Sequence, residues 1–139
     1  MRENRTFDSE LELTDAGAII ESAAGLVDES AQIIDVGTGK FDGTVVIDVT
    51  AITINDRDEL YQIAIQGSSD SAFADTYESL AILELGNADV LVSDVDSTVG
   101  RYMVPFSNER NGTNYQYIRI YTTISGTSPS ITMISRIGK

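Results

Sequence analysis

Residues 115–124 read YQYIRIYTTI, and two kinds of side chain alternate along them. The mainly aliphatic positions are Gln116, Ile118, Ile120, Thr122 and Ile124. The mainly aromatic positions are Tyr115, Tyr117, Arg119, Tyr121 and Thr123. Successive side chains of a β-strand point to opposite sides of the sheet, so the pattern predicts a half-buried strand with an aliphatic inner face. Tyrosines on both sides of an arginine are unusual for a face that contacts only solvent.

Further short runs of β-branched and apolar residues predict the other strands of an all-β domain. These runs cover residues 33–36, 44–54, 61–67, 80–85, 101–106 and 131–137. Clusters of Gly, Asn, Asp and Ser separate them, and no segment keeps a 3.6-residue apolar period over three turns. Many short antiparallel strands must bury their apolar faces on each other, so we expect a jelly roll, or more generally a two-sheet antiparallel β-sandwich.

Local features predict details of these strands. In residues 44–54, the alternation places Val45, Ile47, Val49 and Ala51 on one side. Pro105 cannot donate a ladder hydrogen bond, so its strand should end there or lie at a sheet edge.

Two connecting segments are also informative. The pair Asn111 and Gly112 suits a turn that needs positive φ. Residues 15–26, DAGAIIESAAGL, favour a strand or an irregular extended segment. A short helix capped by Asp15 is the alternative.

The length of 139 residues fits one domain with a single core. We expect this β-sandwich to cover residues 11–139, and residues 1–10 to form a flexible arm. In the arm, Arg2, Arg5 and Phe7 would contact a partner. No stretch has the apolar core of a signal peptide or the length of a membrane span. We therefore expect a soluble protein made in a cytoplasm, without a membrane partner.

Charge is distributed unevenly along the chain, whose formal net charge is −13. Residues 1–100 hold 21 acidic and four basic side chains, a net −17, whereas residues 101–139 hold one acidic and five basic side chains, a net +4. The basic strands could pair beside acidic ones within a sheet, or form an edge that docks on an acidic partner. Phosphate binding needs clustered Lys and Arg, so no nucleic-acid partner is expected.

The composition argues against an enzyme, because the chain has no His and no Cys. It thus lacks the commonest general base and the most nucleophilic side chain. Residues 93–97, SDVDS, lack the Gly and final Glu of a calcium loop, and residues 37–40, GTGK, lack the spacing of a phosphate loop. Close carboxylate pairs arise by chance among 22 acidic residues. We expect no catalytic residue, no cofactor and no metal site.

Three explanations fit the aromatic face of residues 115–124. The tyrosines could lie against the second sheet or under a loop, with Arg119 paired to a carboxylate. The residues Tyr115, Tyr117, Arg119 and Tyr121 could instead form a protein interface, because Tyr and Arg are enriched where surfaces become buried. They could also form a carbohydrate-binding platform on which sugar rings stack.

The amino-acid sequence of several segments also resembles a known family. The segments that carry the resemblance are FDSELELTDAGAI (residues 7–19), SAAG (22–25), IIDVGTGKFDGTVVIDVTAI (33–52), YQIAIQGS (61–68), LAILELG (80–86) and GRYMVPFSNERNGTNYQYIRIYTTISGT (100–127). In order and spacing they are similar to the capsid cement (decoration) proteins of short-tailed phages, typified by the Bordetella phage cement protein. Residues 128–139 match this family least, and no functional residue is carried over from it.

The resemblance implies a structural virion protein made in the host cytoplasm. Members of this family are small jelly rolls that form homodimers on the outer surface of an icosahedral phage head. There they clamp neighbouring capsomers of a major capsid protein with the HK97-type fold. The main alternative function that the residues leave open is a carbohydrate-binding β-sandwich module, and the second is a hydrolase that uses two carboxylates.

Overall fold

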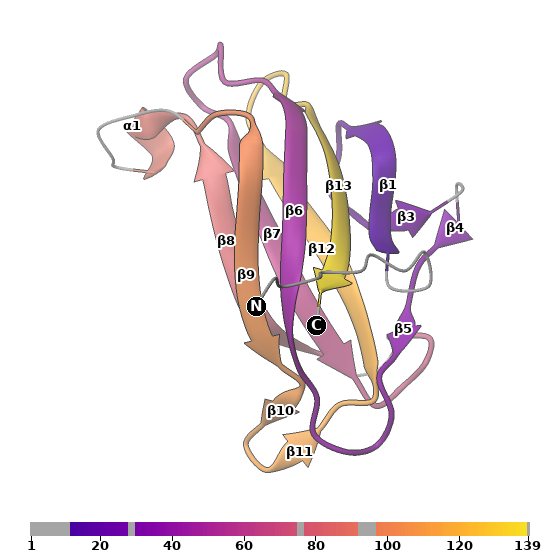
Figure 1. Ribbon diagram of the computed structural model, residues 1–139. Helices are drawn as coiled ribbons and strands as arrows, with labels where there is room; N and C mark the ends of the chain where they lie inside the picture. Colours follow the sequence, from indigo (N-terminus) through magenta and orange to yellow (C-terminus); the bar gives the residue numbers. More distant parts are fainter. Residues whose placement is uncertain (1–11, 28–29, 75–76, 92–96, 139) are drawn as a thin grey trace, which may run out of the picture.

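The computed structural model describes residues 12–27, 30–74, 77–91 and 97–138, which form two antiparallel β-sheets packed face to face (Figure 1). The first sheet consists, in spatial order, of β1 (Glu12–Ile19), β13 (Ile131–Gly138), β6 (Asp42–Ile52) and β9 (Gly100–Ser107). The second sheet consists of β2 (Ala23–Ala24), β12 (Tyr117–Ser125), β7 (Leu60–Ser68) and β8 (Glu78–Gly86). The predicted all-β sandwich is confirmed.

Short elements complete the chain. The strand β5 (Ile34–Asp35) pairs with β12 on the same edge as β2. Two small hairpins are formed by β3 (Leu26–Val27) with β4 (Ser30–Ala31), and by β10 (Glu109–Arg110) with β11 (Thr113–Asn114). The helix α1 (Ala88–Leu91) follows β8. Across the described ranges, no helix has the length and apolar character needed to cross a membrane.

The connectivity is that of a jelly roll. Because β2 and β5 share one edge of β12, the chain passes through eight strand positions, from β1 through this edge, β6, β7, β8, β9 and β12 to β13. The first sheet then has the order 1-8-3-6 and the second sheet 2-7-4-5. The first position pairs with the eighth, the second with the seventh, the third with the sixth and the fourth with the fifth, which is the pairing of jelly rolls.

The core fills the space between the inner faces of the two sheets. Its fully buried side chains include Val45 and Ile47 of β6, Ile63 and Ile65 of β7, Ile118 and Ile120 of β12, and Ile131, Met133 and Ile137 of β13. Each strand contributes every second residue, as the period-two pattern predicts. The aliphatic face of the opening stretch therefore lies in the core.

The prediction for Ala51 is wrong, although Val45, Ile47 and Val49 are buried as expected. Met133 pairs with Val49 but Thr132 pairs with Ala51, so the pairing of β6 with β13 skips Thr50. A bulge of one residue moves all later side chains to the opposite face. Ala51 is consequently exposed.

The other local predictions are confirmed. Residues 15–26 contain the end of β1 and the short strands β2 and β3, so the helix alternative is wrong. Pro105 lies in β9, an edge strand of the first sheet. Asn111 and Gly112 have φ of 54° and 85° and form the turn between β10 and β11.

The hydroxyl group of Tyr61 ties two connecting segments together beneath one end of the sandwich. It lies 2.6 Å from the carbonyl oxygen of Thr53 and 3.1 Å from that of Ser130, and it accepts a 2.9 Å hydrogen bond from the Ser130 N–H. Tyr61 is fully buried, so water cannot replace these partners without local opening. The contacts join the segment after β6 to the segment before β13.

We predict that Tyr61→Phe lowers the free energy of unfolding by about 1–3 kcal/mol, because it removes the partner of the part-buried Thr53 carbonyl oxygen and Ser130 N–H. The matched control is Tyr102→Phe, whose hydroxyl donates to the Thr98 carbonyl oxygen at an exposed site, and which should cost less than about 0.5 kcal/mol. Urea denaturation of both variants measures the difference. Equal stability of the two variants would contradict a structural role for the Tyr61 hydroxyl.

Candidate functional site

The outer face of the second sheet carries three of the four predicted interface residues. Tyr117, Arg119 and Tyr121 are half-buried and point away from the core, because Ile118 and Ile120 between them fill it. They stand beside β7, where Tyr117 pairs with Ser68, Arg119 with Gln66 and Tyr121 with Ala64. The expectation that these side chains pack against the second sheet of the sandwich is wrong, since the two sheets meet on their other faces.

Tyr115 does not belong to this face. The strand β12 begins at Tyr117, after a bend at Gln116. Gly67 pairs with the buried Ile118, so a side chain at Gly67 would point toward the core. A Cβ built there would lie 3.0 Å from the Tyr115 Cβ. The alternation therefore breaks before the strand starts, and the Tyr115 Cβ lies toward the inner side of the sheet.

A backbone contact explains this position of Tyr115. Its N–H donates to the carbonyl oxygen of Asn108 at 2.9 Å, and the Asn108 side-chain amide donates back to the Tyr115 carbonyl oxygen at 2.9 Å. Asn108 is fully buried. Its hydrogen bonds therefore fix the position of Tyr115, just before β12 begins.

Aromatic rings surround the guanidinium group of Arg119. Its Cζ lies 4.4 Å from the ring centroid of Phe73, 5.3 Å from that of Tyr121 and 5.4 Å from that of Tyr77. These distances are within the range of cation–π attraction, about 6 Å. We call Phe73, Tyr77, Arg119 and Tyr121 the aromatic cluster.

Hydrogen bonding and burial define the chemistry of Arg119. Its Nε donates to the Gln66 side-chain oxygen at 2.8 Å, and within the described ranges it forms no salt bridge with a carboxylate. Burial lowers the pKa of Arg119 from its ordinary value, while the nearby hydroxyl groups of Tyr77 and Tyr121 oppose this change. Among the described residues, the expected pairing of Arg119 with a carboxylate is therefore not found.

The segment after β7 places Phe73 on the arginine. The carboxylate of Asp70 accepts hydrogen bonds from the N–H groups of Ala72 at 3.0 Å and Ala74 at 2.9 Å, and its carbonyl oxygen accepts one from Phe73 at 3.1 Å. Phe73 has φ of 53°, and its side chain is buried. Part of the outer face thus lies under a loop, as one of the three explanations expected.

Sequence reasoning missed Phe73, Tyr77 and Gln66. They lie on β7 and the segment that follows it, far in sequence from Arg119, and only the pairing of β7 with β12 brings them together. A usable signal was the position of Gln66 on the polar side of a predicted strand. Tyr77 remains 51% exposed, so the aromatic cluster is open on one side. The predicted arm residues Arg2, Arg5 and Phe7 lie outside the described residues.

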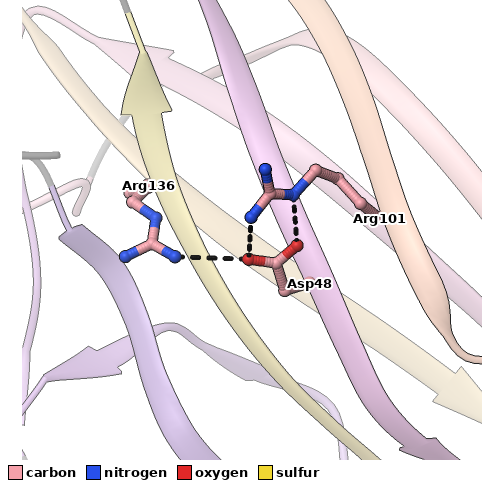
Figure 2. Close-up of polar contacts among 3 residues, drawn as sticks. All are labelled: Asp48, Arg101 and Arg136. Carbon is pink, nitrogen blue, oxygen red and sulfur yellow. Dashed lines mark hydrogen bonds and ion pairs between the residues drawn. The ribbon is translucent and has the colours of Figure 1, made fainter. Parts of the chain in front are cut away.

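The basic C-terminal strands meet an acidic residue on the outer face of the first sheet (Figure 2). Arg101 of β9 binds both carboxylate oxygens of Asp48 on β6, at 2.7 and 3.1 Å. Arg136 of β13 approaches the same carboxylate at 3.2 Å from the other side. This arrangement confirms, for two of the five basic residues after residue 100, that basic strands pair beside an acidic one within a sheet.

The comparisons with known proteins assign no family. The chain matches no protein-family model and no curated protein.

We predict that Asp48→Asn destabilises the protein by about 1 kcal/mol at pH 7, a value suited to partly exposed ion pairs. Hydrogen bonds from Arg101 hold the pKa of Asp48 below its usual value of 3.8. A carboxylate with a lowered folded-state pKa stabilises the fold above its unfolded pKa, and this contribution disappears as pH falls through the folded-state pKa. The difference between variant and parent should therefore shrink as the pH falls below 3.8.

Chemical denaturation at pH 7 and at about pH 3 measures this change. The control is Asp42→Asn, an exposed residue at the start of the same strand, which should have little effect at either pH. A stability difference for Asp48→Asn that is the same at both pH values would count against the ion-pair explanation.

Proposed function

We propose that this protein is a structural virion protein, a capsid cement (decoration) protein. It binds the outside of an icosahedral phage head as a homodimer and stabilises contacts between capsomers of a major capsid protein with the HK97-type fold. The jelly-roll topology is the fold that the resemblance of residues 7–127 implies. A fold hosts many functions, so the proposal depends on a surface suited to protein contacts.

The observation that carries the proposal is the aromatic cluster, whose arginine forms no ion pair with the other described residues. Aromatic residues and Arg are enriched in the cores of protein interfaces, where they contribute much of the binding energy. The ring contacts and the Gln66 hydrogen bond already order the Arg119 side chain in the single chain. Little conformational entropy is then lost when a partner covers it.

Apolar side chains extend this surface across the sheet. Tyr121 pairs with Ala64, and Ala64 pairs with Ile82 of β8, so the three side chains lie in one row on the outer face. Ile82 is 55% exposed. The exposed Ile82 thus continues the half-buried Tyr121 and Ala64 across the outer face, which favours one continuous apolar surface for protein contact over scattered surface residues.

The charges indicate that Arg119 pairs with a carboxylate of another protein molecule. The chain as a whole has a net charge of −13, and like charges on two copies repel. Arg119 has no carboxylate partner in the part of the chain that the structure describes, so a carboxylate of the second copy or of the capsid protein could pair with it. Paired across a two-fold axis, the same patch would be buried on both copies.

The mechanism that we propose is stabilisation by binding. A protein that binds the assembled shell and not its separate subunits lowers the free energy of the shell by RT ln(1 + [L]/Kd) at each site. This amounts to about 2.7 kcal/mol at a hundredfold excess over Kd. Repeated over many sites, it makes the head more resistant to the pressure of the packaged DNA.

A carbohydrate-binding module is the second candidate, and the exposure of Tyr77 is the observation that favours it. A sugar ring could stack on the free side of this tyrosine. The Arg119 guanidinium lies against all three rings of the cluster, so less ring surface remains for a sugar. The chain also has no Trp, which offers the largest flat surface for stacking.

We predict that the purified protein has about twice the monomer mass of 15.0 kDa in light scattering at micromolar concentration. Tyr117→Ala and Arg119→Ala should each weaken association by about 1–3 kcal/mol, in the dimer or on expanded phage capsids of the proposed HK97-type partner. Met103→Ala, an exposed apolar residue on the first sheet, is the control and should leave binding unchanged.

The melting temperature of each variant separates binding from folding. If Tyr117→Ala and Arg119→Ala unfold the isolated domain, the face is part of the structural framework and the proposal loses its support. If both variants associate normally but lose affinity for a polysaccharide, the carbohydrate-binding function replaces it. A parent protein that stays monomeric and does not bind capsids would also contradict the proposal.

A further inference from the structure

The turn between β6 and β7 brings three carboxylates together, at the end of the sandwich that also carries the connection between β12 and β13 (Figure 1). One carboxylate oxygen each of Asp56, Asp58 and Glu59 lies within 4.8 Å of the others. Calcium binds oxygen ligands at about 2.3–2.6 Å, so two ligands on opposite sides of the ion are about 5 Å apart. The three oxygens are thus close enough to share one calcium ion.

Glu59 supplies an independent indication that the cluster binds a cation. Its side chain is fully buried, whereas Asp56 and Asp58 are exposed. One oxygen, Oε2, accepts a 2.9 Å hydrogen bond from the Asp56 N–H, but the buried Oε1 has no hydrogen-bond partner. A buried carboxylate oxygen without a donor or a cation is unfavourable. A metal ion bound by the Glu59 carboxylate would offset this cost.

Neighbouring segments hold the turn in place. The carboxylate of Asp58 accepts hydrogen bonds from the Thr127 N–H at 3.1 Å and from the Thr127 hydroxyl at 2.5 Å. The carbonyl oxygen of Glu59 accepts a 3.1 Å hydrogen bond from the Asn87 N–H. Gly126 has φ of 126°, and a Cβ there would lie 3.0 Å from the Asp58 carbonyl oxygen. The ligands are therefore positioned before any ion arrives.

The charge of the turn also favours a divalent cation. Arg57 lies between Asp56 and Asp58 in a left-handed conformation, with φ of 66°. It is the one basic residue among residues 53–60, so the ionised turn has three negative charges and one positive charge. The remaining negative charge, within a chain of net −13, attracts cations to this end of the sandwich.

We propose that Asp56, Asp58 and Glu59 bind one calcium ion. Calcium fits better than magnesium, because it accepts irregular coordination by carboxylates and water, whereas magnesium requires a near-ideal octahedron at about 2.0–2.1 Å. Zinc prefers His and Cys ligands, which the chain lacks. Bound calcium would link the turn after β6 to the start of β7 and stabilise this end of the sandwich.

Titration with CaCl2 after treatment with EDTA tests the proposal directly. Isothermal calorimetry should give one site per chain with a Kd of about 10⁻⁵–10⁻³ M. At CaCl2 about tenfold above Kd, the melting temperature should rise by roughly 5 °C. The same concentration of MgCl2 should give a clearly smaller rise. Absence of both the heat signal and the thermal shift at millimolar CaCl2 would overturn the proposal, and would indicate that Arg57 alone balances the cluster.

Two ligand variants and one control identify the site. Asp56→Asn keeps the hydrogen bond from the backbone N–H of residue 56 to Glu59 Oε2. It removes one negative ligand and should weaken calcium binding about tenfold or more. Glu59→Gln should also abolish the thermal response to CaCl2. Because Asp56 is exposed, its variant remains a valid test even if Glu59→Gln does not fold.

Asp42→Asn is the matched control, since Asp42 is an exposed carboxylate at the other end of β6, roughly 30 Å from the turn. It should bind calcium like the parent protein. If Asp56→Asn binds calcium as tightly as the parent, or if Asp42→Asn weakens binding equally, calcium acts through the overall negative charge and the proposed site is wrong.

Discussion

Each side chain of β12 that fills the core forces its neighbour in the chain onto the outer face, because a β-strand has a period of two. Ile118 and Ile120 are fully buried between the sheets, and β12 is hydrogen-bonded along both edges. A slip of one residue would place Arg119 in the core and both isoleucines in water. The register of β12 is therefore strongly determined, and Arg119 must find its partners outside the core.

Among the described residues, these partners are aromatic rings and a side-chain amide. Gln66 accepts the hydrogen bond from Nε, and Phe73, Tyr77 and Tyr121 cover the guanidinium group. On the first sheet, Asp48 instead lies between Arg101 and Arg136, so two positive charges share one carboxylate. The two outer faces thus differ in chemistry, with an ion-pair cluster on one and an ordered aromatic surface on the other.

The two proposals concern separate parts of this framework. The aromatic cluster lies on the flat outer face of the second sheet, where a partner could cover a broad area. The carboxylates of Asp56, Asp58 and Glu59 lie in a turn at one end of the sandwich. A cation there would stiffen the connection between the sheets without changing the face that a partner would contact.

The sequence by itself determined the features that depend on local pattern. The alternation in residues 44–49, 61–65 and 117–124 identifies strands and their inner faces, because every second residue of each segment is apolar and lies in the core. Pro105 predicts a sheet edge because it lacks an N–H, and Asn111 with Gly112 predicts a turn with positive φ. These properties belong to one residue or to its immediate neighbours.

Only the tertiary structure decided which distant residues meet. Gln66 and Arg119 are 53 positions apart, and nothing in either segment specifies that they form a hydrogen bond. The bulge at Thr50 reverses Ala51 through the pairing with β13, and the bend at Gln116 removes Tyr115 from the aromatic face. The burial of Glu59 among exposed carboxylates likewise depends on Asn87 and Thr127, which approach from later segments. Contacts of this kind are set by sheet pairing and packing across the whole jelly roll, so a local pattern cannot predict them.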